Sequence, residues 1–84
     1  MRKLLLIPLL ALAAPALAQE LSEGMTLGTT SEEVEASLTE MGYEIRKSEM
    51  EDGKIEVYFV RDGEMGEVYV NTETGRIDTL EMEG

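Results

Sequence analysis

The residues most able to do chemistry in this chain are its carboxylates. Eighteen aspartates and glutamates stand against seven lysines and arginines, and neither histidine nor cysteine occurs among the 84 residues. The usual activators of a nucleophile and the usual zinc ligands are therefore missing. Two carboxylates can act as general acid and base, but here the acidic residues are spread along the whole chain. We expect a protein that is not an enzyme, has no catalytic residues and uses no cofactor.

The acidic residues also suit a hard cation, so a calcium-binding protein of the cell envelope is the alternative function. A calcium loop would need acidic residues alternating around a central glycine, and the sequence has no such pattern. Asp52 and Asp62 each precede a glycine, which a hairpin turn explains. The methionines, which could hold a soft metal, are scattered and are explained by packing. No defined metal site is predicted.

Residues 1–18 have the pattern of an export signal. Arg2 and Lys3 give a basic start, an apolar run follows, and Ala16-Leu17-Ala18 is the small-x-small pattern that a signal peptidase recognises. We expect cleavage before Gln19. The apolar run is short and interrupted by prolines, so it does not suit a membrane span. The mature protein is therefore expected to be periplasmic or secreted, with no stable membrane anchor.

The chain then divides into a signal peptide at 1–18, an N-terminal arm at 19–29 and a folded domain at 30–84. Loss of the signal removes two of the seven basic residues and changes the net charge from −11 to −13. This charge disfavours nucleic acid and anionic membranes as partners, and it favours basic ones. Solubility alone would also explain it. We expect a monomer or a weak dimer.

A helix is predicted over residues 30–41. Thr30-Ser31-Glu32-Glu33 is a capping box, in which the Thr30 hydroxyl accepts from the Glu33 N–H and the Glu33 side chain reaches back. Gly42 stands where a left-handed C-terminal cap is wanted. Residues at helical spacing form one apolar stripe: Val34, Leu38 and Met41. The arm before the helix has no assigned structure.

After the helix the hydrophobic period changes to two, which indicates strands. The predicted strands cover residues 43–50, 55–61, 65–71 and 76–80. Asp52-Gly53 and Asp62-Gly63 are two-residue hairpin signals, and residues 72–75 form a longer turn that ends in glycine. Such short connections predict an antiparallel meander.

The loop length of the second hairpin sets its register. A two-residue loop pairs Arg61 with Glu64, and the apolar pairs then share one face: Phe59 with Gly66, Val57 with Val68 and Ile55 with Val70. The helix stripe needs such a face as its partner. We predict an α+β fold, with one N-terminal helix packed on one face of a three- to four-stranded antiparallel meander sheet.

The first hairpin is less regular. A simple two-residue loop at Asp52-Gly53 would turn Ile45 away from the apolar face. A β-bulge near Arg46-Lys47 would let both Ile45 and Met50 face inward.

The opposite face of the sheet receives a mixed set of side chains: Glu56, Tyr58, Val60, Met65, Glu67 and Tyr69. Aromatic and methionine side chains are enriched at protein interfaces. The candidate partner-binding face therefore consists of Tyr58, Val60, Met65 and Tyr69. An ordinary half-exposed face is the alternative, since tyrosine fits a strand. A sheet edge offers a second docking mode, in which an extended peptide is added as a strand.

This order of motifs resembles the PepSY family, in its short stand-alone exported form. The likeness covers roughly residues 30–80. It is carried by the following segments: Met41-Gly42-Tyr43 at the helix end, Asp52-Gly53 in the hairpin, Val68-Tyr69-Val70 in a strand and Thr74-Gly75 in the last turn. The family often has Asp-Pro before that turn, where this chain has Asn71-Thr72.

The resemblance implies a non-catalytic, exported, protein-binding domain. PepSY domains occur in propeptides of secreted metallopeptidases and in cell-envelope proteins, and they are thought to inhibit peptidases or regulate their surroundings. The family has no catalytic residues to carry over to this chain. The implied function is a peptidase inhibitor or modulator, and the implied partner is a peptidase or another envelope protein; transfer of this role rests on analogy.

Overall fold

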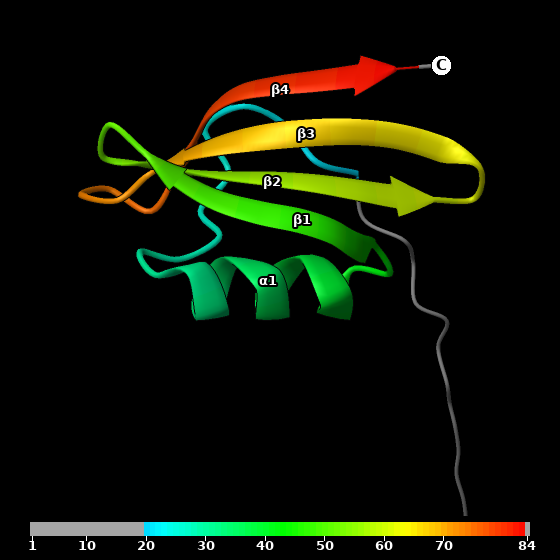
Figure 1. The fold of residues 1–84 in the computed structure, drawn as a ribbon, viewed down its shortest axis with the longest axis horizontal. Coiled ribbons are helices and arrows are strands. Elements are labelled where there is room, and N and C mark those ends of the chain that lie inside the picture. The colour runs from blue at the N-terminus through cyan, green and yellow to red at the C-terminus, as the bar shows by residue number, and fades with distance from the viewer. Residues whose placement is uncertain (1–19, 84) are drawn as a thin grey trace, which may run out of the picture.

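The computed structural model describes residues 20–83, which form one helix and four strands (Figure 1). In chain order the elements are α1 (Ser31–Glu40), β1 (Glu44–Glu51), β2 (Lys54–Arg61), β3 (Glu64–Asn71) and β4 (Ile77–Glu83). The strands pair in the order β1-β2-β3-β4, each antiparallel to its neighbour. Figure 1 shows α1 on one side of this sheet. The predicted α+β meander is confirmed with four strands; the predicted signal peptide lies outside the described residues.

At the start of α1, the predicted hydrogen bond to the Thr30 side chain is present, but the Glu33 side chain bonds to a different residue from the one expected. Thr30 is the N-cap, and its Oγ1 accepts from the Glu33 N–H at 3.1 Å. The Glu33 carboxylate, however, accepts from the N–H of Thr29 at 2.9 Å rather than from Thr30. The chain passes so close to Glu33 at Gly28 that a Cβ on Gly28 would lie 2.5 Å from the Glu33 Cβ. This fold of the backbone presents the Thr29 N–H to the carboxylate.

The second hairpin has the predicted register. Arg61 pairs with Glu64, and the three apolar pairs follow in the expected order along β2 and β3. Asp62 and Gly63 both have positive φ, 55° and 82°, as the mirror-image turns of two-residue hairpins require. The loop length and the side-chain pattern therefore specify the same pairing.

The first hairpin contains the predicted bulge, because the register of β1 against β2 shifts between Ile45 and Lys47. Ile45 packs against the core. Met50 pairs with the inward-facing Ile55 and so lies on the inner side, as predicted, but its side chain is 59% exposed rather than buried. Figure 1 shows why, since the turn between β1 and β2 extends beyond the start of α1, and the helix does not cover that end of the sheet.

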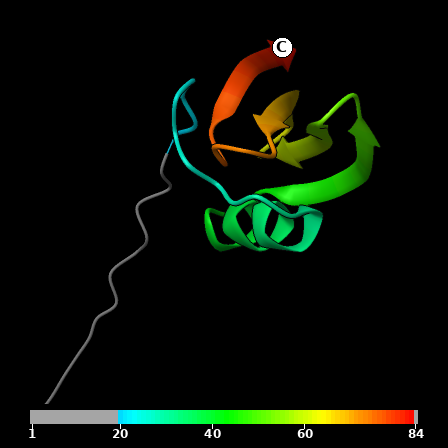
Figure 2. The same ribbon diagram turned by 90° about the vertical axis from the view of Figure 1, so that its left-hand side faces the viewer.

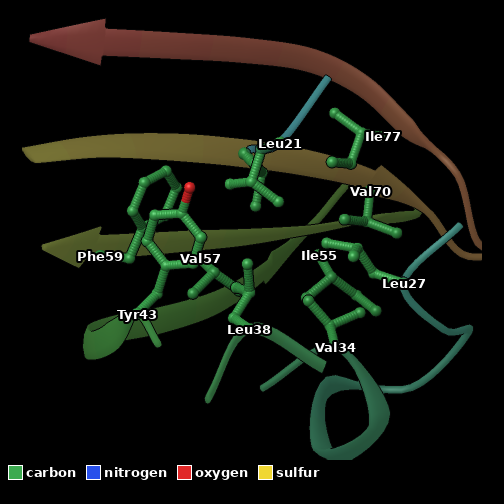
Figure 3. Close-up of a cluster of buried hydrophobic side chains, with 11 residues drawn as sticks. Leu21, Leu27, Val34, Leu38, Tyr43, Ile55, Val57, Phe59, Val70 and Ile77 are labelled. Carbon is green, nitrogen blue, oxygen red and sulfur yellow. The ribbon is translucent and has the colours of Figure 1, made fainter. Parts of the chain in front are cut away.

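The core lies between α1 and the inner face of the sheet (Figure 3). Val34 and Leu38 of the helix are fully buried there. The sheet and its connections contribute the following residues: Tyr43, Ile55, Val57, Phe59, Val68, Val70 and Ile77. The rings of Tyr43 and Phe59 meet edge to face, with their centroids 4.9 Å apart. Such a pair is worth about 0.5–1.5 kcal/mol beyond its buried area.

The arm before α1 is the part of the fold that the sequence did not predict. Leu21 and Leu27 from this arm are buried in the same core. The arm runs beside the start of β4 (Figure 2), where the Gly24 N–H donates to the Ile77 carbonyl at 2.8 Å. The Ile77 N–H donates back to the Met25 carbonyl at 2.9 Å. Ser37 of α1 then donates to the Leu27 carbonyl at 2.7 Å. The arm therefore joins the last strand to the helix.

The last strand is longer than predicted. β4 continues to Glu83 rather than ending at Leu80, because residues 81–83 pair with Met65, Gly66 and Glu67 of β3. Those last residues are exposed and mostly acidic, so hydrophobic periodicity does not mark them. Val70 pairs with Ile77, and Asp78 forms a second bulge.

Candidate partner-binding face

The four predicted partner-binding residues lie together on the face of the sheet that faces away from α1. Val60 pairs with Met65 across β2 and β3, Tyr58 pairs with Glu67, and Glu56 pairs with Tyr69. We call these six residues the outer face. Its tyrosines and glutamates alternate both along each strand and across the strand pair. Met65 is 51% exposed, whereas Tyr58, Val60 and Tyr69 are half-buried.

Two carboxylates are buried within this outer face. Glu56 is 4% exposed and Glu67 is 8% exposed, although α1, the helix of the described residues, lies on the other side of the sheet. Both lie on the two central strands, where the neighbouring tyrosines shield them. The Tyr58 hydroxyl donates a hydrogen bond of 2.9 Å to Glu56 Oε2. A buried carboxylate is tolerated only when such donors satisfy it.

The two carboxyl groups respond differently to this environment. Hydrogen bonding from Tyr58 and Tyr69 lowers the pKa of Glu56. The Tyr69 hydroxyl also acts to lower the pKa of Glu67, but burial and the adjacent Glu56 outweigh it, and the pKa of Glu67 is raised. Negative charge therefore concentrates on Glu56, and Glu67 is the first of the pair to take up a proton as the pH falls.

The tyrosines are held as neutral phenols by the same contacts. The hydrogen bond to Glu56 raises the pKa of Tyr58 to about 12. Hydrogen bonding with Glu67 and Glu56 raises the pKa of Tyr69. On β1, the Lys47 ammonium lies 5.9 Å from the centre of the Tyr58 ring and 2.9 Å from the Glu49 carboxylate. That carboxylate raises the pKa of Lys47, so the cation beside Tyr58 remains charged.

The perturbed carboxyl groups of the outer face form a hydrogen-bond network with its tyrosines. Perturbed carboxyl groups occur in active sites, but also in structural hydrogen-bond networks. Glu56 and Glu67 lie on a sheet face, and neither lines the two hollows found beside the arm. Within residues 20–83, no group of three acidic side chains is placed to hold a metal ion. The strand register predicts both glutamates on this face but not their burial, for which the alternation with tyrosine is the available signal in the sequence.

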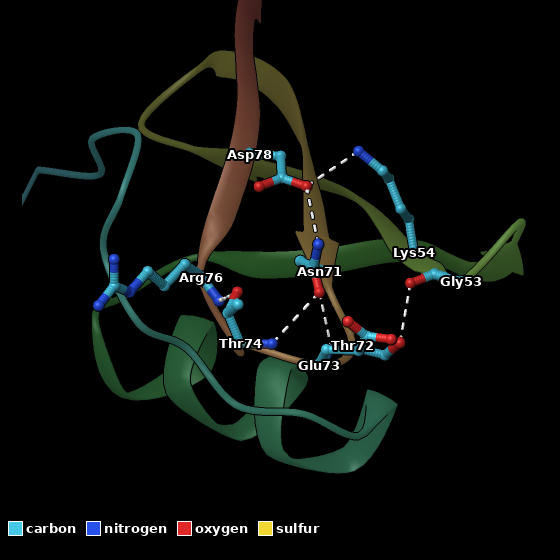
Figure 4. A network of polar contacts seen from close by, with 8 residues as sticks. All are labelled: Gly53, Lys54, Asn71, Thr72, Glu73, Thr74, Arg76 and Asp78. Carbon is cyan, nitrogen blue, oxygen red and sulfur yellow. Dashed lines mark hydrogen bonds and ion pairs between the residues drawn. The ribbon is translucent and has the colours of Figure 1, made fainter.

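A second polar cluster lies at the end of the sheet near the last turn (Figure 4). The Lys54 ammonium is 2.9 Å from Asp78 Oδ2, and this contact lowers the pKa of Asp78. Asn71 Oδ1 accepts from the backbone N–H groups of Glu73 at 2.7 Å and Thr74 at 3.2 Å. The asparagine side chain thus closes the turn at the position where the resemblance leads one to expect aspartate.

Comparison with known proteins decides the family. The model of the peptidase propeptide and YPEB domain family, a PepSY family, matches residues 2–80. The chain belongs to this PepSY family. No curated protein and no solved structure matches the chain.

Membership carries the general properties of PepSY domains. They are generally non-catalytic, resemble propeptides or inhibitors, and interact with peptidases or other proteins. They are typically extracellular or periplasmic. In the part of this PepSY domain that the structure describes, no helix has the length and apolar character needed to cross a membrane.

Proposed function

We propose that this PepSY domain is an exported, non-catalytic protein that binds a peptidase or another cell-envelope protein through its outer face and modulates its activity. The observation that carries the proposal is the composition of that face. Tyr58, Val60, Met65 and Tyr69 lie side by side on two central strands, on the side that neither α1 nor the arm covers. Family membership supports a protein partner.

The buried glutamates prepare this face for binding. A tyrosine whose hydroxyl is held by a carboxylate has fewer orientations to lose when a partner arrives, so less of the binding free energy is spent on ordering it. Tyr58 has such a bond to Glu56. Tyrosine and methionine also supply the large contact areas that dominate binding energy at interfaces. The face therefore combines apolar contact area with fixed geometry.

The charges around the outer face favour a partner with positive charge at the matching border. Its neighbours on the outer strands are mostly acidic, with Glu49 opposite Glu56 and Glu81 opposite Glu67. Lys47 is the basic exception, and Glu49 partly neutralises it. We expect the partner to present an apolar patch bordered by lysine or arginine, and we expect association to slow as salt screens these charges.

Affinity capture from a cell-envelope extract, followed by measurement of the dissociation constant with the purified partner, tests this proposal. The double variant Tyr58→Ala/Tyr69→Ala should bind at least about tenfold more weakly, as expected for two interface aromatics. The matched control is Thr39→Ala/Glu40→Ala, on the exposed side of α1. If the tyrosine variant stays folded by circular dichroism and binds as tightly as the control, the outer face is not the contact surface.

A further inference from the structure

A separate surface lies where the arm leaves β4. Between the described residues of the arm and β4, the backbone hydrogen bonds lie at the start of the strand, around Ile77. At Leu80 the arm contributes a side chain rather than its backbone: the Leu80 N–H donates to Glu23 Oε2 at 3.3 Å. β4 is the last strand of the sheet, and no described strand lies beside it from Leu80 to Glu83. This stretch of edge can accept the backbone of another chain.

A hollow of about 240 Å³ lies beside this edge. Its apolar lining comes from the following residues: Leu21, Tyr43, Leu80 and Met82. Three carboxylates complete it: Glu20, Glu64 and Glu83. Met82 is 48% exposed on the inner face, where it lies against Gly66. The hollow therefore has apolar walls and an acidic rim, and it opens next to the strand edge.

This combination matches a lysine or arginine side chain, which has an apolar stem and a cationic head. The protein already places one such side chain at the same end of the core. The Arg61 guanidinium lies 4.0 Å from the centre of the Tyr43 ring and donates to Glu20 Oε2 at 3.2 Å. It also donates to the Met41 carbonyl at 2.9 Å. An incoming basic side chain would meet the same two kinds of contact, aromatic or aliphatic surface for its stem and a carboxylate for its head.

We propose that Leu80–Glu83 of β4 bind an extended segment of a partner protein as an added strand, and that a lysine or arginine of this segment occupies the adjacent hollow. Charge complementarity commits the site to a basic segment, since Glu64 and Glu83 line the hollow together with Glu20, which already binds Arg61. The opposite edge of the sheet is a poorer acceptor, because the bulge at Arg46 and the charge of Lys47 blunt it. This site does not include any residue of the outer face, so the proposal stands independently of the proposed function.

The probe for this site is an acetylated and amidated pentapeptide, Thr-Val-Arg-Val-Thr, titrated into the ¹⁵N-labelled protein and followed by two-dimensional NMR. We expect saturable shifts of the Leu80–Glu83 amides and slower hydrogen exchange at Met82. The matched peptide with glutamate in place of arginine should bind at least about threefold more weakly, as expected for loss and reversal of a charge contact. Shifts confined to β1 or the outer face, no saturation, or equal binding of the glutamate peptide would each overturn the proposal.

Variants locate the site without disturbing the core. Glu64→Gln/Glu83→Gln, at two exposed positions, should weaken binding of the arginine peptide by about three- to tenfold, which corresponds to two surface charge contacts. The control Glu51→Gln/Glu73→Gln removes the same charge from exposed positions outside the hollow and should bind as the unmodified protein does. Equal weakening in both variants would overturn the site in favour of general charge attraction. Tyr58→Ala/Tyr69→Ala should leave peptide binding unchanged, which separates this site from the outer face.

Discussion

Phe59 of β2 lies directly over Gly66 of β3. The two residues are cross-strand partners, and a Cβ on Gly66 would come within 2.9 Å of Phe59 Cζ. The same Cβ would lie 2.7 Å from the Met82 sulfur and 2.7 Å from the Glu81 carbonyl oxygen. Glycine at this position is thus a packing requirement: it lets the aromatic ring and a neighbouring strand close over bare backbone.

Gly66→Ala is accordingly expected to destabilise the domain by about 1–3 kcal/mol, the usual effect of an added methyl in a packed core. The added methyl must displace Phe59, Met82 or the β4 backbone, and the carbonyl of Glu81 has the least freedom to move. Urea denaturation measures the change in the free energy of unfolding. Thr39→Ala, at an exposed helix position, is the control. A Gly66→Ala protein as stable as this control would show that β2 and β4 leave room for a methyl group at Gly66.

The buried carboxyl pair predicts opposite effects of neutralising Glu67 and Glu56. The raised pKa of Glu67 means that the folded protein binds this proton more tightly than the unfolded chain. The stability from that proton is fully present below the unfolded pKa and is lost as the pH rises through the folded pKa. Glu67→Gln removes the ionisation and keeps an oxygen for Tyr69. It should therefore raise the melting temperature at pH 7, with a benefit that shrinks toward pH 4.

The effect of Glu56 on stability has the opposite pH dependence. Its lowered pKa gives stability that is present above the unfolded pKa and is lost as the pH falls through the folded pKa. Glu56→Gln should lower the melting temperature at pH 7, and the loss should shrink in acid. Thermal melts of both variants at pH 4, 5.5 and 7 measure these differences. Melting temperatures that shift in the same direction for both variants would contradict the assignment of the proton to Glu67.

The parts of this fold that the sequence predicts are those in which two independent patterns agree. The two-residue loop at Asp62-Gly63 and the alternation of Ile55, Val57 and Phe59 specify one register, and the structure has it. The helix follows in the same way from its capping box and its apolar stripe. For the outer face, the register alone brings Tyr58, Val60, Met65 and Tyr69 together; whether a partner binds there stays a prediction.

The parts that the sequence does not predict depend on contacts between distant segments. Leu21 and Leu27 lie in an arm without periodicity, and hydrogen bonds to Gly75 and Ile77 place it against the core. The burial of Glu56 arises from the tyrosines beside it, whereas hydropathy assigns any glutamate to the surface. The exposure of Met50 depends on where α1 begins relative to the first hairpin, and the register of the strands does not specify that position.

The last turn depends on the side chain of Asn71, a position at which the family often has aspartate. Asn71 Oδ1 accepts two backbone hydrogen bonds, from Glu73 and Thr74. Asn71→Ala leaves both N–H groups to solvent and should cost about 1–2 kcal/mol in the free energy of unfolding. Asn71→Asp keeps an accepting oxygen, but it places a carboxylate near Asp78, which lies 3.4 Å from the present amide nitrogen. We expect a smaller loss for aspartate than for alanine; equal losses would show that the side-chain oxygen does not hold the turn.

The arm is expected to be part of the folding unit rather than a flexible leader. Leu27 is buried in the core, its N–H donates to the Gly75 carbonyl at 2.7 Å, and its carbonyl accepts from Ser37. Leu27→Ala should therefore cost about 2–5 kcal/mol, as for other leucines removed from a core, and urea denaturation measures it. Ser22→Ala changes an exposed residue of the same arm and should cost almost nothing. Because small domains have only about 5 kcal/mol of stability in total, Leu27→Ala should leave a measurable unfolded fraction at 37 °C. If Leu27→Ala were as stable as Ser22→Ala, the helix and sheet would form the domain without the arm.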